Sequence, residues 1–317
     1  MSVSFASASD TKEQRPQVVE LGRNVYGYIS EFDPNCGFIV GDDSILVVDT
    51  RPTPKMARSF IDDIRQVSDK PIKTVFLTHY HAVRVMGASA FEGATVISSR
   101  GTHDWIVERG QADFESEVYR FPRLFQAVDE VPGLTMPQLS FDGTMSLWFG
   151  DREVRFQHFG RGHSQGDAIC WLPADRIVFS GDLVENRCGV YAGDAYIGDW
   201  MGILDALKKL EPQVLVPGRG AALFDAASAA AAIDMTRDFL RTLIDTVGAA
   251  RAKGADLRAC YDAALAVMQA RFGDWPVFQH VLPFDVSRAY DELAGIVDPR
   301  VWTAQRDHEL WAALKAA

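Results

Sequence analysis

The sequence predicts an α/β domain followed by a helical extension, and two patterns lead to this prediction. From residue 18 to about residue 224, short runs rich in β-branched and aromatic residues alternate with turns and helical segments. From residue 225 to residue 317, long alanine-rich segments of helical period replace the strands. A chain of 317 residues can form one large domain or two. We therefore divide it into an α/β part, residues 18–224, and a helical extension, residues 225–317.

The elements of the α/β part can be assigned in chain order. Residues 18–30 (VVELGRNVYGYIS) and 35–50 (NCGFIVGDDSILVVDT) are strand-like, and GDDS is the turn of a hairpin. Residues 54–68 space their apolar side chains along one helical face, and KTVFLTH (73–79) is the next strand. We expect an irregular stretch over 100–140. An amphipathic helix is expected at 199–210, and further strands at 146–160, 167–173, 176–184 and 213–220.

Composition narrows the classes of partner. The formal net charge is -11, and no run of Lys or Arg occurs, which argues against nucleic acid because its binding depends on clustered cations. The longest apolar stretches are much shorter than the roughly 20 residues that span a bilayer. Residues 1–17 lack the features of a secretion signal. We expect a soluble, cytoplasmic protein that acts on a small molecule. Four cysteines without a CxxC pair are expected to be buried free thiols.

Three histidines and an aspartate follow predicted strands. His79 and His81 follow TVFL, His163 lies in the turn GRGHSQGD, and Asp182 lies in FSGDLV. Arg219, in VPGRG, ends another strand. Polar residues at the strand ends of one sheet can converge on a single crevice. Three imidazoles and a carboxylate suit zinc, or iron with a position left for substrate.

These segments resemble motifs of the metallo-β-lactamase superfamily. THYHAVRVMG (78–87) is similar to T-H-x-H-x-D-H-x-G-G, and GFIVGDDSILVVDT looks like the hairpin that ends in the family's buried aspartate, here Asp49. GRGHSQGD resembles the G-H-T-x-G-D turn, SGDLV the segment of the metal-bridging aspartate, and VPGRG the final P-G-H-G. The resemblance covers about residues 18–222. It implies a four-layer αββα sandwich with a metal site at one edge between the sheets.

The same resemblance implies one complete metal site and one altered site. The first consists of His79, His81 and His163, with Asp182 as a fourth or bridging ligand. In the second, the family's aspartate is Val83, and its two histidines are Arg84 and Arg219. The two arginines either hold an anionic substrate group or neutralise buried Asp182 and Asp49; these roles are compatible.

We therefore expect a hydrolase with one zinc per chain and a metal-activated water. Its catalytic residues would be Asp182, which orients the water, and Arg84 and Arg219, which steady an anionic group or oxyanion. The resemblance suggests an ester, lactone, thioester or amide as substrate. Two alternatives remain open: an iron oxygenase that uses His79, His163 and Asp182, and a non-catalytic module that binds anions.

Other residues have subordinate predicted roles. Asp167 is expected to support a ligating histidine. His280 is expected to be structural, or to cap the pocket from the helical extension. The extension also offers a possible homodimer interface, because it holds three tryptophans. Four large apolar residues near the irregular stretch suggest a pocket wall, and equally a core: Phe121, Phe125, Met136 and Trp148.

Overall fold

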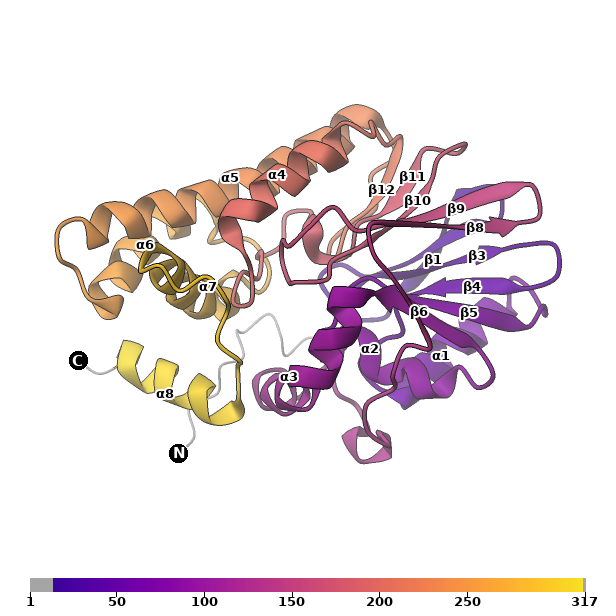
Figure 1. Cartoon of the computed structure of the whole chain (residues 1–317), viewed down its shortest axis with the longest axis horizontal. Helices are drawn as coiled ribbons and strands as arrows, with labels where there is room; N and C mark the ends of the chain where they lie inside the picture. Colours follow the sequence, from indigo (N-terminus) through magenta and orange to yellow (C-terminus); the bar gives the residue numbers. More distant parts are fainter. Residues whose placement is uncertain (1–13, 316–317) are drawn as a thin grey trace.

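The computed structural model describes residues 14–315, and its strands form two sheets that pack face to face (Figure 1). The first sheet has seven strands in chain order: β1 (Gln17–Gly22), β2 (Val25–Ile29), β3 (Cys36–Val40), β4 (Ile45–Val48), β5 (Ile72–Leu77), β6 (Thr95–Ser99) and β7 (Leu139–Phe141). Its first four strands are antiparallel, and β4 to β7 run parallel.

The second sheet has five strands in the spatial order β12-β11-β10-β9-β8. Their bounds are β8 (Thr144–Phe149), β9 (Arg152–Gln157), β10 (Ile169–Leu172), β11 (Ile177–Phe179) and β12 (Val214–Val216). Only the β11–β12 pair is parallel. The expected hairpin turn at GDDS joins β3 to β4.

Helices cover the outer faces of both sheets. The first sheet is covered by α1 (Pro54–Arg65), α2 (Ala82–Val85), η2 (Met86–Ala90) and α3 (Arg100–Arg120), and the second by α4 (Ile197–Lys208) and α5 (Ala226–Arg251) (Figure 1). Two short 3-10 turns, η3 (Val128–Glu130) and η4 (Gly181–Leu183), complete the α/β part. The layers are therefore helix, sheet, sheet, helix, which confirms the predicted αββα sandwich.

Alternation along the strands explains the layers. Successive side chains of a strand point to opposite faces of its sheet. In β5, Val75 and Leu77 pack beneath the helices, while Phe76 lies between the sheets and stacks on Phe156 of β9 at a ring-centroid distance of 4.2 Å. Because side chains on both faces of this central strand pack in a core, its carboxyl end is held in place. The histidine motif begins directly after that end, so its position is held as well.

The predicted irregular stretch over 100–140 is wrong in its first half. Residues 100–120 form α3, the longest helix on the first sheet. Four charged side chains recur along its buried side at spacings of three or four residues: Arg109, Asp113, Glu117 and Arg120. Because charge replaces the usual apolar stripe on that side, hydrophobic periodicity does not indicate this helix.

The helical extension confirms the change of pattern after β12. It consists of α5, α6 (Leu257–Phe272), α7 (Phe278–Leu293) and α8 (Ala304–Lys315). Asp225 caps α5 by accepting from Ser228 N at 2.8 Å, a role for which aspartate is well suited. Trp275 and Trp302 are buried within the chain, and the predicted dimer interface stays a prediction, as do the domain bounds.

Two further sequence predictions concern the cysteines and membrane-spanning segments. All four cysteines are buried thiols outside any disulfide, as expected. Among residues 14–315, none of the helices combines the length and apolar character that crossing a bilayer requires.

Candidate metal centre

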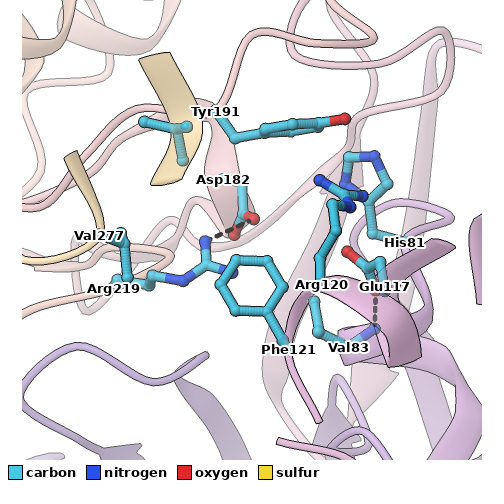
Figure 2. A pocket seen from close by; sticks show the side chains of 10 residues that line it. His81, Val83, Glu117, Arg120, Phe121, Asp182, Tyr191, Arg219 and Val277 are labelled. Carbon is cyan, nitrogen blue, oxygen red and sulfur yellow. Dashed lines mark hydrogen bonds and ion pairs between the residues drawn. The ribbon is translucent and has the colours of Figure 1, made fainter. Parts of the chain in front are cut away.

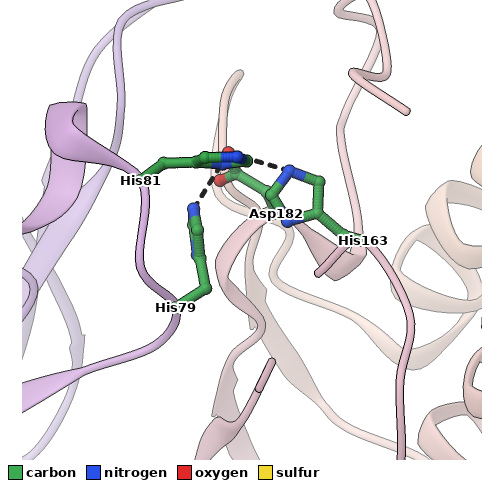
Figure 3. Close-up of side chains that lie close together, drawn as sticks. All are labelled: His79, His81, His163 and Asp182. Carbon is green, nitrogen blue, oxygen red and sulfur yellow. Dashed lines mark ion pairs between the residues drawn. The ribbon is translucent and has the colours of Figure 1, made fainter. Parts of the chain in front are cut away.

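The four predicted ligands lie together at one edge between the sheets. His79 follows β5, His81 is the N-cap of α2, and His163 lies in the loop between β9 and β10. Asp182 belongs to η4, directly after β11. One ligand atom from each of the four lies within 4.8 Å of the others, and all four side chains are buried. Figure 3 shows the rings and the carboxylate pointing toward one another from three separate segments.

The three imidazole rings surround a common point. Their centroids are 4.7 to 5.1 Å apart, and each pair of rings is nearly perpendicular. Nε2 of His79 and Nε2 of His163 are buried and have no hydrogen-bond partner among the described residues. Buried polar atoms are nearly always satisfied, so two unpartnered nitrogens that converge with a carboxylate fit a metal ion.

The opposite nitrogens of these two rings are held in place. Thr78 Oγ1 donates to Asp49 Oδ2 at 2.8 Å, and it therefore accepts from Nδ1 of His79, 3.0 Å away. Nδ1 of His163 donates to Asp167 Oδ1 at 3.2 Å. These bonds leave the lone pair on Nε2 of each ring, which is the form that binds a metal. Burial lowers the pKa of His79 well below its usual value, so this ring is neutral.

His81 is oriented from the other side. Its Nε2 donates to Asp194 Oδ2 at 3.2 Å, which leaves Nδ1 for the ion. The Tyr191 hydroxyl donates to the same Asp194 oxygen, also at 3.2 Å. Asp113 lies close behind, and together with His81 and Asp194 it forms a second group with donor atoms within 4.8 Å. Sequence patterns did not indicate Asp194, which lies 113 residues from its partner and in no motif.

Asp182 is the electrostatic centre of the site. Its Oδ2 lies 3.6 Å from Nε2 of His79 and 3.2 Å from Nη1 of Arg219, and its Oδ1 accepts from Nη2 of Arg84. Burial acts to raise the pKa of this carboxyl group, but the two arginines and the histidines outweigh burial and hold it well below its usual range. Asp182 is therefore ionised and accepts hydrogen bonds only.

Arg84 lies beneath Asp182 and is fully enclosed. Its guanidinium group donates to the carbonyl oxygens of Asn35 and Gly218 as well as to Asp182, and Nη1 is 3.6 Å from Asp49 Oδ2. The side chain is 1% exposed. It therefore links the two aspartates, while its role in catalysis or in neutralising them stays a prediction.

Arg219 occupies the opposite side of Asp182 and reaches the surface of a small cavity. Its Nη1 also donates to Glu185 Oε1 at 3.1 Å. Burial, together with the charge of Asp182, raises the pKa of Glu185 to about 8. Glu185 lies three residues beyond Asp182 and, like Asp194, was not predicted from the sequence.

A short backbone link connects α3 to the histidine motif. The Ala82 amide donates to Asp113 Oδ2 at 2.7 Å, and the Val83 amide donates to Glu117 Oε2 at 2.8 Å. The first amides of a helix have no partner within it, and carboxylates stabilise them. The buried charges of α3 therefore hold the turn that carries His81.

The cavity beside these residues is narrow and closed on one side by the helical extension (Figure 2). The space open to the centre of a water molecule is about 20 Å³, room for about one or two waters. Its lining is mixed in character: His81, Val83, Glu117, Arg120, Phe121, Asp182, Tyr191, Arg219, Val277 and Val281.

The remaining residues named in the sequence analysis lie in different surroundings. Of the four apolar residues named as wall or core, Phe121 lines the cavity and Phe125 lies in the core. Met136 is partly buried and packs against that core, and Trp148 is 65% exposed. His280 is buried against the outer side of that wall, with its ring 3.7 Å from Phe121 between centroids.

Comparison with known proteins places this geometry in a family. The sequence matches the model of the metallo-beta-lactamase superfamily over residues 29–219. A type 2 metallo-beta-lactamase of Bacillus cereus is 25% identical over 215 residues, which cover 64% of this chain and 76% of the relative. Another, from Elizabethkingia meningoseptica, is 21% identical over 210 residues, covering 62% and 75%.

Solved structures show the same fold. A metallo-beta-lactamase from Pontibacter korlensis aligns with a TM-score of 0.58 at 18% identity, covering 71% of this chain and 99% of that one. A stereoselective inverting sec-alkylsulfatase from Pseudomonas sp. aligns with a TM-score of 0.65 at 17% identity, covering 87% of this chain and 50% of that one. With the family model matching more than half of its length, the chain belongs to the metallo-β-lactamase superfamily of metallohydrolases.

Proposed function

We propose that the protein is a hydrolase that uses one metal ion, with zinc as the ion, to cleave a small ester, lactone, thioester or amide that carries an anionic group. The observation that supports it most directly is the pair of buried, unpartnered Nε2 atoms of His79 and His163, which converge with His81 and Asp182. When bound, zinc supplies a water of lowered pKa and polarises the bond to be cleaved.

The residues around Asp182 support a single ion. A second ion needs ligands where this chain has Val83, Arg84 and Arg219. The Val83 side chain has no ligand atom. Arg84 donates to Asp182 Oδ1, and Arg219 contacts the other oxygen, Oδ2. Guanidinium groups remain charged at any working pH, so positive charge is kept on that side of the carboxylate without a second ion.

Each side chain has a defined task under this proposal. Asp182 Oδ2 accepts a hydrogen bond from the attacking water and fixes its direction. Arg84 acts through Asp182, because it is enclosed by protein and holds that carboxylate in place. Arg219 faces the cavity and balances negative charge that develops on the substrate.

Metal analysis of the purified chain tests the proposal. Elemental mass spectrometry should give about one zinc per chain. His81→Ala should lose it, and His308→Ala, an exposed histidine on α8, should not. Two ions per chain would contradict the role of the arginines. One iron with oxygen consumption would favour the oxygenase, and no metal after reconstitution would favour the anion-binding module.

A substrate screen follows from the same reasoning. The panel contains carboxylate-bearing and neutral esters, lactones, thioesters and amides. It also contains secondary alkyl sulfates, because the sec-alkylsulfatase match extends over 87% of this chain and so beyond the α/β part. Hydrolysis that is lost in His81→Ala and retained in His308→Ala would support the proposal. Turnover that survives in both variants would assign it to another site.

A further inference from the structure

Arg120, at the end of α3, is a buried cation with an unused donor. Its side chain is 1% exposed, and it lines the cavity. Nη2 is buried and has no hydrogen-bond partner among the described residues. An arginine nitrogen in this state is costly, because a buried donor loses its hydration without compensation. A bound acceptor would remove that cost.

The guanidinium group is held firmly although Nη2 is free. Nε donates to Ser116 Oγ at 3.1 Å, and the Ser116 hydroxyl donates to Asp307 Oδ2 of α8 at 2.6 Å. The guanidinium carbon lies 4.6 Å from the centre of the Phe284 ring. This arrangement fixes the group before any ligand arrives, which reduces the entropy lost on binding.

Neighbouring carboxylates do not account for the unused donor. Asp307 approaches Arg120 at Nε, with an N–O distance of 3.7 Å, and Nη2 has no hydrogen-bond partner among the described residues. Asp113 and Glu117 each accept from a backbone amide of α2, and neither forms an ion pair with Arg120 in the described part of the chain. Arg120 balances their charge at longer range, while Nη2 keeps its hydrogen-bonding capacity.

Arg120 also lies close to the metal site. Its guanidinium carbon is 5.3 Å from the centre of the Tyr191 ring, and the His81 ring packs against the same tyrosine at 5.4 Å. Figure 2 shows Arg120 and Arg219 on opposite sides of the Phe121 ring, with Asp182 beyond it. Because the cavity has room for about one or two waters, it fits a carboxylate group and not a whole substrate; a carboxylate there would meet two guanidinium groups and an apolar wall.

We propose that Arg120 binds the carboxylate of the substrate and selects carboxylate-bearing substrates over neutral ones of the same shape. This inference rests on the proposed function in that the ligand is taken to be the substrate of the metal site. Arginine suits the task because its donors match the geometry of a carboxylate. Asp307 and Ser116 act as positioning residues, so α8 contributes to recognition although it lies outside the cavity lining.

Binding can be measured without turnover. Hexanoate and hexanamide have the same length and differ in charge, and their affinities for the metal-free and the zinc-loaded protein can be compared by calorimetry. We expect the wild type to prefer hexanoate. Arg120→Lys should reduce that preference about tenfold or more, because lysine lacks the planar fork. Affinity for hexanamide should stay unchanged.

Arg109→Lys is the matched control. Arg109 is another buried arginine of α3, but it stacks on Trp105 and pairs with Glu108 outside the cavity lining. Its replacement should leave the preference intact. If Arg120→Lys does not fold, Ser116→Ala keeps the arginine and removes the acceptor of its Nε, and it should reduce the preference by a smaller factor. An unchanged preference in a folded Arg120→Lys or Ser116→Ala variant would overturn the proposal.

Kinetics separate this inference from the proposed function. The substrates are the mono-p-nitrophenyl ester of adipic acid and p-nitrophenyl hexanoate. For the first, Arg120→Lys should raise KM with little change in kcat. If both esters are hydrolysed and the ratio of their kcat/KM values is the same in the wild type and in Arg120→Lys, the inference is refuted and the proposed hydrolase function stands. If hexanoate binding depends on Arg120 but no ester is hydrolysed, the role of Arg120 in carboxylate binding stands and the proposed ester hydrolysis does not.

Discussion

The ion pair between Arg84 and Asp182 gives the most quantitative prediction. Both side chains are at least 97% buried, and Arg84 also donates to the carbonyl oxygens of Asn35 and Gly218. Removing one member leaves the other with one remaining ionic partner, Arg219 at 3.2 Å for Asp182 and Asp49 at 3.6 Å for Arg84. Arg84→Gln should therefore lower the free energy of unfolding by about 3 kcal/mol, the lower end of the range for breaking a buried pair, and Asp182→Asn should cost a similar amount. The double variant removes both charges of this pair, Arg219 keeps Glu185 as an ionic partner, and the glutamine amide can still donate to one carbonyl. We expect it to lose only about 1 to 3 kcal/mol.

Urea unfolding followed by circular dichroism, at neutral pH on chelator-treated protein, measures these three values. The metal is removed first so that the cycle reports the ion pair alone. The control cycle uses Arg258 and Asp262, an exposed ion pair on α6 with an N–O distance of 3.1 Å, for which the coupling should stay below about 1 kcal/mol. A coupling energy for Arg84 and Asp182 no larger than this control would show that the guanidinium does not neutralise Asp182.

Three further predictions concern other parts of the site and its surroundings. Asp194→Asn should weaken zinc binding about 10- to 100-fold in chelator competition, because the partner of His81 Nε2 becomes neutral; unchanged affinity would remove Asp194 from the metal site. Val277→Gly removes a side chain that lines the cavity and should admit longer acyl chains, while glycine adopts the φ of 58° without the strain of a β-branched residue. Hydrolysis rates that vary with chain length as in the wild type would show that Val277 does not limit the acyl chain. Burial raises the pKa of Asp285 well above its usual value, so its stabilising contribution is complete below the unfolded pKa of about 4 and is lost as the pH rises through the folded pKa. As the pH rises from 4, the wild type should therefore lose stability relative to Asp285→Asn, and parallel profiles of the free energy of unfolding against pH would contradict the raised pKa of Asp285.

The four residues of the candidate metal centre could be predicted because each one lies in a short motif next to a strand end. His79, for example, follows three residues of β5 that are buried on both faces, so the local sequence alone fixes where the motif begins. Its register then follows from strand alternation. The layered αββα arrangement was predictable from the same strand patterns together with the family resemblance, but α3 was not.

The supporting residues could not be predicted in this way. The inward side of α3 is charged, and a charged stripe at helical spacing normally indicates a solvent face. Glu117 and Asp113 face inward because they cap the first amides of α2, a partner that lies more than 30 residues away in sequence. Sequence patterns describe local periodicity, and they contain no information on which distant backbone group a buried carboxylate serves.

The enclosed guanidinium of Arg84 has a consequence for how the protein responds to metal supply. A zinc ion can be taken by a competing chelator or exchanged for another metal, whereas a cation that is part of the chain cannot dissociate. With Arg84 fixed beside Asp182 by two backbone carbonyls, one side of the carboxylate stays neutralised in metal-poor surroundings. Under the one-metal function proposed above, occupancy would follow a single binding equilibrium, and Arg84 would hold Asp182 in place while the metal is exchanged.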